Sequence, residues 1–144
     1  MSERCAECGG VLPVGRTCQH IFDECLALEL TDHAFGKVHM LTVACFMIQH
    51  GRYSEEALSW IGPQVQDHLN GVPARYLRQR AASAVANTKH PVKILRDAGA
   101  EPQPRVDWSV TIVDVVPFLQ DADAYCEQIE RWARATVHEM KAIS

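Results

Sequence analysis

Three cysteines near the N-terminus are the residues whose type and spacing most clearly suggest chemistry. Cys5 and Cys8 form a C-x-x-C pair followed by Gly9 and Gly10, and Cys18 comes ten residues after Cys8. Such a turn directs two thiolates at one point, and the glycines permit the tight backbone that it needs. Zinc binds thiolates well and takes four ligands in a tetrahedron. The sequence therefore predicts a zinc site whose fourth ligand lies elsewhere in the chain.

The third cysteine is expected at the start of a helix. Thr17, directly before Cys18, is a residue type that caps helix N-termini. The free amides and the dipole of a first helical turn favour a thiolate there. Two other interpretations stay open, namely free thiols that adjoin by chance and a redox pair of the thioredoxin type. The redox pair is less favoured because no strand precedes the C-x-x-C and no βαβ pattern surrounds it.

The fourth ligand has to be chosen among residues that can bind zinc, and the candidates are His20, Cys25, His39 and His50. His20 follows Cys18 by two residues and lies on a different face of the same helix. Cys25 lies about 10 Å further along that helix. Neither position suits a ligand that must meet Cys18.

A histidine from the next helix fits better. Two helices joined by a short loop run antiparallel, so the end of the second should lie near the start of the first. This places His50 beside Cys18 and makes it the predicted fourth ligand. The same argument places His39 near Glu29 or Cys25.

A second group of residues allows an alternative in which the protein is an enzyme. Asp23, Glu24, Glu29 and His39 could meet between facing helices, where bundles build metal or acid–base sites. Glu24 and His39 are the candidate catalytic residues of such a site. The other interpretation is a buried His39 that hydrogen-bonds to Glu24 or Glu29. The chain shows no Ser/His/Asp grouping, phosphate loop or dinucleotide fingerprint.

The elements that must position these residues are helical. Residues 36–50 are almost entirely apolar, which predicts a helix in the middle of a bundle. Its polar residues, His39, Thr42, Gln49 and His50, need partners inside the protein. Periodicity and capping residues predict further helices over residues 18–30, 55–69, 73–85 and 122–143. Trp60 and Trp132 lie on apolar faces and are expected in the core.

Several boundaries are less regular. The central helix is expected over residues 34–49, and Gly62-Pro63 should kink or split the third helix. Residues 87–104 are expected as an irregular connection with one helical turn near 92–96. Residues 106–116 alternate like a strand, but Thr111-x-x-Asp114 resembles a helix cap, and a short helix to about Leu119 is preferred. The predicted fold class is an all-α helical bundle with an N-terminal Cys-rich metal knuckle.

Composition and charge limit the classes of function. The 144 residues suggest a single domain, with residues 1–17 as the metal knuckle and 18–144 as the bundle. The net charge of −4 argues against binding to nucleic acid or anionic membranes, which need a basic surface. No apolar run reaches transmembrane length and the N-terminus has no apolar signal region, so a cytoplasmic location is expected. The sequence leaves the oligomeric state open.

Motifs along nearly the whole chain resemble one family of small bacterial proteins described only as a domain of unknown function. They include the C-x-x-C-Gly, the Cys18-led helix, the segment from Gly36 to Val43, Gln49-His50, Thr111-x-x-Asp114-Val115 and Trp132-Ala133-Arg134. The family follows Gln-His with proline, whereas this chain has Gly51, which loosens that helix end. The resemblance implies a mostly helical domain with a Cys-rich N-terminus and brings no established activity.

The leading hypothesis is a zinc-binding helical protein whose metal is mainly structural and whose surface serves a protein partner in an interaction or regulatory role. One alternative is a metal-dependent enzyme with an open coordination position near Glu24 and His39. Another is a thiol-based redox or metal sensor. The number of protein ligands separates the first two, because four close a zinc site and three leave a position for water.

Overall fold

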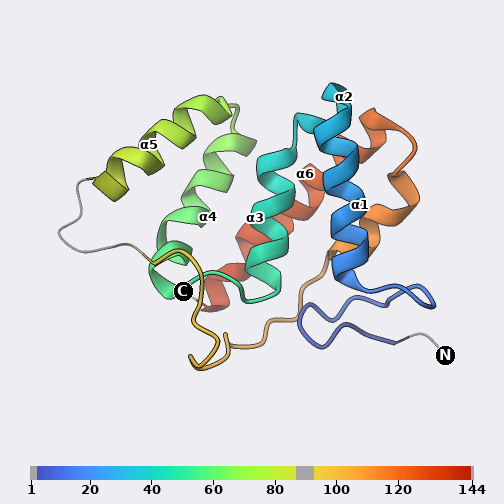
Figure 1. Cartoon of the computed structure of the whole chain (residues 1–144), viewed down its shortest axis with the longest axis horizontal. Coiled ribbons are helices and arrows are strands. Elements are labelled where there is room, and N and C mark those ends of the chain that lie inside the picture. The colour runs from blue at the N-terminus through green and yellow to red at the C-terminus, as the bar shows by residue number, and fades with distance from the viewer. Residues whose placement is uncertain (1–2, 87–92, 144) are drawn as a thin grey trace.

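The computed structural model describes residues 3–86 and 93–143 and shows a helical bundle (Figure 1). Its α-helices are α1 (Cys18–Thr31), α2 (His33–Gly36), α3 (His39–Gln49), α4 (Glu55–Leu69), α5 (Ala74–Ala86) and α6 (Ala122–Glu139). Two 3₁₀ segments, η1 (Ile112–Phe118) and η2 (Met140–Ile143), flank α6. Extended pairing within the described ranges is limited to isolated bridges. The predicted all-α bundle is confirmed.

Helix α3 lies in the middle of the bundle, in contact with α1, α4 and α6. Most of its side chains are buried, as expected for a helix that is apolar on nearly every face. The buried residues are Leu41, Thr42, Ala44, Cys45, Phe46, Ile48 and Gln49. Helix α5 packs against α4 and lies at the edge of the bundle in Figure 1.

Three helices begin at the residues that the sequence predicts, because each has a side-chain cap. Thr17 Oγ1 accepts from the amide of His20 at 3.2 Å at the start of α1. Ser54 caps α4, and Asp121 caps α6 in the same way. These caps satisfy amides that a helix start leaves without intrahelical partners.

The central helix is shorter than predicted, because residues 34–49 form two helices rather than one. Asp32 caps α2 by accepting from the amide of Ala34 at 2.9 Å. The chain then passes close to α1, since a Cβ on Gly36 would lie 2.7 Å from the carbonyl oxygen of Glu29. Three residues later α3 starts at His39, so the close approach at Gly36 explains the break.

Three further predictions about element boundaries can be compared with the structure. The capping box of Thr111 and Asp114 is present and starts a 3₁₀ helix over Ile112–Phe118, so the short helix that the sequence analysis preferred over a strand is confirmed. Pro63 lies inside a continuous α4, which is therefore not split. The helical turn expected near residues 92–96 is absent over 93–96, where Leu95 instead bridges to Tyr53. Residue 92 lies outside the described residues.

The core is built around α6 and α3. Trp132 is fully buried, as predicted, whereas Trp60 is only partly buried and packs against the edge of the core. In the ranges that the structure covers, no helix combines the length and apolar character that crossing a membrane requires.

Candidate metal centre

The start of α1, the end of α3 and the N-terminal segment meet at one end of the bundle (Figure 1). Cys5, Cys8, Cys18 and His50 each place one ligand atom there, and these atoms all lie within 4.8 Å of one another. The residues predicted as ligands are thus brought together and could bind a metal ion. The antiparallel argument that selected His50 correctly places it at the Cys18 end of α1.

The C-x-x-C pair lies on a tight turn that its own backbone stabilises. The amide of Cys5 donates to the carbonyl of Gly10 at 2.9 Å, and the amide of Gly9 donates to the carbonyl of Cys5 at 2.9 Å. Gly9 has φ of 78°, a left-handed conformation that glycine adopts without strain. The amide of Gly10 points at Cys8 Sγ at 3.5 Å, which favours a thiolate at Cys8.

Gly10 also fixes the knuckle against the rest of the protein. A Cβ at this position would lie 2.6 Å from Thr111 Oγ1 and 2.8 Å from a methyl carbon of Val113. The knuckle therefore packs at Gly10 directly against Thr111 and Val113, and a residue with a side chain would not fit at this position.

The spacing of the ligand atoms matches a tetrahedral zinc site. Cys8 Sγ and Cys18 Sγ are 3.7 Å apart. Zinc–sulfur bonds of about 2.3 Å in a tetrahedron place two sulfurs about 3.8 Å apart. Without a metal the two sulfurs share a hydrogen bond, which lowers the pKa of Cys8 below its ordinary value. The same contact raises the pKa of Cys18.

His50 is held in one orientation, with one ring nitrogen left for a metal. Nδ1 lies 2.8 Å from the carbonyl oxygen of Phe46, which can only accept, so Nδ1 carries the hydrogen. Nε2 is buried and has no hydrogen-bond partner in the part of the chain that the structure describes. The rings of Phe46 and His50 stack at 4.1 Å, and Phe22 stacks on Phe46 at 3.9 Å. A buried nitrogen without a partner is costly, and a metal ion would satisfy it.

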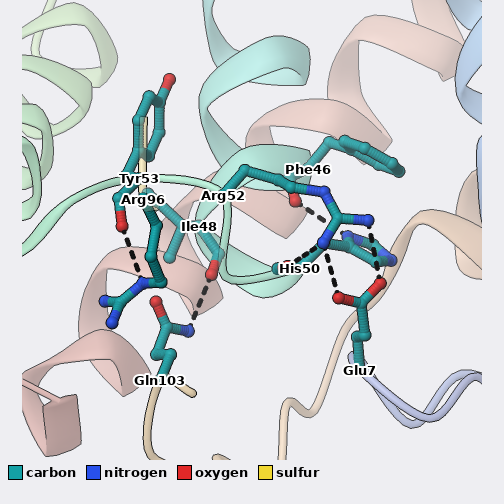
Figure 2. A network of polar contacts seen from close by, with 8 residues as sticks. All are labelled: Glu7, Phe46, Ile48, His50, Arg52, Tyr53, Arg96 and Gln103. Carbon is teal, nitrogen blue, oxygen red and sulfur yellow. Dashed lines mark hydrogen bonds and ion pairs between the residues drawn. The ribbon is translucent and has the colours of Figure 1, made fainter. Parts of the chain in front are cut away.

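An ion pair connects the knuckle to the end of α3. Arg52 Nη1 and Nη2 donate to the two carboxylate oxygens of Glu7 at 2.7 and 3.1 Å (Figure 2). Arg52 Nη1 also donates to the carbonyl of His50 at 2.8 Å. Glu7 lies between the two cysteines of the C-x-x-C, so one guanidinium contacts both halves of the ligand set.

The turn after His50 depends on a residue that can take a left-handed backbone. Gly51 has φ of 65°, which proline cannot adopt because its ring holds φ near −65°. Glycine takes this conformation without strain, so the chain can turn directly after His50.

The other residues considered as ligands lie elsewhere. His20 is exposed on α1, and Cys25 is buried in the core, where burial raises its pKa to about 11. Glu24 is paired with Arg16 at 2.8 Å on the surface and is not a partner of His39. Cys45, a further cysteine of the chain, is buried within α3.

His39 belongs to a separate polar cluster. Its Nδ1 lies 2.8 Å from Glu29, whose side chain is fully buried. Glu29 also accepts from Thr42 and from Tyr125, each at 2.5 Å. Burial, the neighbouring Cys25 and the contact with Glu29 raise the pKa of Tyr125. The hydrogen bond from His39 to Glu29 is thus one that the sequence offered as an alternative, but the His39 side chain is 42% exposed rather than buried.

Sequence reasoning missed several of these partners. Tyr125 lies 96 residues from Glu29, and no spacing rule connects them. The pairing of Arg52 with Glu7 joins residues 45 apart in the same way. Gln49, which the sequence places on the polar side of the central helix, donates to the carbonyl of Val110 at 2.9 Å and to Thr136 at 3.0 Å. The sequence predicted only that Gln49 needs a hydrogen-bond partner inside the protein, and not which residue that partner is.

Comparison with known proteins adds one finding. Neither the curated proteins nor the solved structures contain a match to this chain. A family model, described as a family of unknown function (DUF5946), matches residues 3–141. That range includes the three cysteines, His50 and every helix that positions them, so the chain belongs to this family of unknown function, DUF5946.

Proposed function

We propose that the protein binds one zinc ion through Cys5, Cys8, Cys18 and His50, and that this metal is structural. The observation that supports it best is the position of four ligand atoms within 4.8 Å of one another, one of them a buried Nε2 without a partner. Three thiolates and one imidazole are a ligand set that zinc uses in closed tetrahedral sites. Four protein ligands leave no position for a catalytic water.

The metal would act as a cross-link between three segments of the chain. Cys5 and Cys8 belong to the knuckle, Cys18 starts α1 and His50 ends α3. Binding would fix the knuckle on the end of the bundle, and the binding free energy would add to the stability of the fold. The surface built around this end would then serve a protein partner in an interaction or regulatory role.

A thiol-based sensor is the second candidate, and one observation favours it. Cys8 Sγ and Cys18 Sγ are 3.7 Å apart, and Cys5 is only partly buried. A peroxide could oxidise one thiolate to a sulfenic acid, with release of water or an alcohol. A second thiolate would then form a disulfide, release hydroxide and leave too few ligands for the metal.

Elemental analysis and X-ray absorption of the purified protein test the proposal. We expect about one zinc per chain, bound by three sulfur atoms and one nitrogen at bond lengths of about 2.3 and 2.0 Å. A chelator should remove the metal and lower the melting temperature. Protein purified without chelator that contains no metal, or whose metal binds an oxygen in place of one protein ligand, would refute a closed structural site.

A further inference from the structure

A cavity of about 230 Å³ lies beside the candidate metal centre, with His50 among its lining residues. Three parts of the chain form its walls, namely the knuckle at Ala6 and Glu7, the end of α3 at residues 49–52, and residues 96–108. It is distinct from the ligand cluster, because the metal-facing nitrogen of His50 is buried. The proposed metal site does not account for it.

Hydrogen bonds between the segments that line the cavity hold it open before any ligand binds. The amide of Arg96 donates to the carbonyl of Arg52 at 2.8 Å. The side-chain amide of Gln103 donates to the carbonyl of Ile48 at 2.9 Å, and Arg96 Nε donates to the carbonyl of Tyr53 at 3.1 Å (Figure 2). Residues 96–103 are therefore fastened to the end of α3 by backbone groups, and a ligand would not have to order them.

The lining of the cavity is positively charged in a protein whose net charge is −4. Arg52, Arg96 and Arg105 line it, and Glu7 is the one acidic residue among its lining residues. Three guanidinium groups against one carboxylate leave an excess of two positive charges, because arginine stays protonated in proteins.

Two of these arginines keep donors for a ligand. Arg96 uses Nε and Nη1 on the carbonyls of Tyr53 and Glu101, which do not neutralise its charge. Arg105 is exposed and forms no hydrogen bond or ion pair with any residue in the described ranges. A second cavity of about 240 Å³, which Arg4 and Cys8 line, shares Arg105 with the first. Arg105 thus lines both cavities.

The same cavity also has apolar lining residues, namely Pro102, Pro104, Val106 and Trp108. A lining that combines guanidinium groups with apolar side chains suits a ligand that has one anionic group and a compact apolar body. The volume is below the usual range for drug-sized ligands, which limits that body to a few carbon atoms or one ring.

We propose that this cavity binds a small organic anion, whose carboxylate or phosphate group is held by Arg96 and Arg105 and whose body lies against Trp108. Both anions accept paired hydrogen bonds from a guanidinium fork. The site is independent of whether the neighbouring metal is zinc. The proposed anion site would be a second binding site at the Cys-rich end of the bundle.

Isothermal titration calorimetry on the full-length protein as purified tests this site, with benzoate, phenyl phosphate and inorganic phosphate as probes. We expect benzoate or phenyl phosphate to bind, more tightly than inorganic phosphate because of the apolar lining residues, and less tightly at high salt. Binding of only one of the two aromatic probes would assign the site to carboxylates or to phosphates. Failure of both to bind would overturn the proposal.

Matched variants locate the binding. Arg105→Gln and Arg96→Gln should each lower the affinity for the probe at least about tenfold, the usual effect of losing a charge-assisted hydrogen bond. Arg131→Gln, an exposed residue of α6 outside both cavities, should bind as the wild type does. Equal affinity of all three variants would show binding elsewhere and refute the site. Metal content measured on each variant keeps this result separate from the metal proposal, since Arg105→Gln should retain its metal.

Discussion

The ring of His50 donates its Nδ1 hydrogen to the carbonyl oxygen of Phe46, one helical turn earlier, at 2.8 Å. This bond selects the tautomer that leaves a lone pair on Nε2, the nitrogen that faces the three cysteines. The ring of His50 also stacks on the ring of Phe46, which restricts its rotation. The last turn of α3 thus holds the ring of His50 in an orientation in which Nε2 could bind a metal.

His50 and His39 should therefore respond differently to substitution. His50→Ala should lower zinc affinity sharply and reduce the melting temperature, because a structural site that loses a ligand loses folding free energy. His39→Ala should keep its zinc, since His39 contacts Glu29 and not the cysteines. Metal content and thermal melts of both variants check this. Loss of zinc from His39→Ala with retention in His50→Ala would mean that the ligand set is wrong.

The hydroxyl of Tyr125 should matter for stability. Tyr125→Phe removes a donor from the buried carboxylate of Glu29, and an unsatisfied buried acceptor costs about 1–3 kcal/mol. Tyr76→Phe is the matched control, because Tyr76 is 48% exposed. Urea denaturation gives both free energies of unfolding. Equal values for the two variants would show that the Glu29 contact adds nothing to stability.

The two tryptophans that the sequence placed in the core should differ in importance. Trp132 is 0% exposed, so Trp132→Ala should cost about 3–5 kcal/mol. Trp60 is only partly buried, and Trp60→Ala should cost less. Chemical denaturation of each variant measures the difference, and fluorescence quenching of the wild type should reach Trp60 before Trp132. A larger loss from Trp60→Ala would contradict the packing described here.

Stability should fall at alkaline pH, partly through Cys45. Burial raises the pKa of Cys45 from 9.0 to about 12. Between these two values the unfolded chain loses a proton that the folded chain keeps, so this contribution is complete below pH 9.0 and is lost as pH rises toward about 12. Cys45→Ala should show a shallower fall in free energy of unfolding over this range. Identical pH profiles for variant and wild type would disprove the assignment to Cys45.

The sequence predicted the parts of this structure that depend on local rules. Thr17, Ser54 and Asp121 cap the expected helices, because capping requires only a short polar side chain at a helix start. His50 was predicted beside Cys18 because short loops force antiparallel neighbours. The four residues that could hold a metal therefore followed from residue type, spacing and one rule about helix pairs.

The parts that were missed depend on contacts between distant segments. The break between α2 and α3 comes from the close approach of Gly36 to the backbone at Glu29, which no periodicity shows. The choice of Glu29 rather than Glu24 as the partner of His39 depends on Tyr125 and Thr42 meeting the same carboxylate. Trp60 has the spacing of a core residue but is only partly buried against the core, because burial depends on what covers a helix face.

The order of the ligands along the chain has a consequence for synthesis. All four lie within the first 50 residues, whereas Tyr125 and Trp132 belong to the last α-helix. A growing chain leaves the ribosome from its N-terminus. The complete ligand set is thus available as soon as the end of α3 has emerged, well before α6 exists to cover Glu29. The end of the bundle that could hold a metal is synthesised first, and the core that surrounds α6 is finished last.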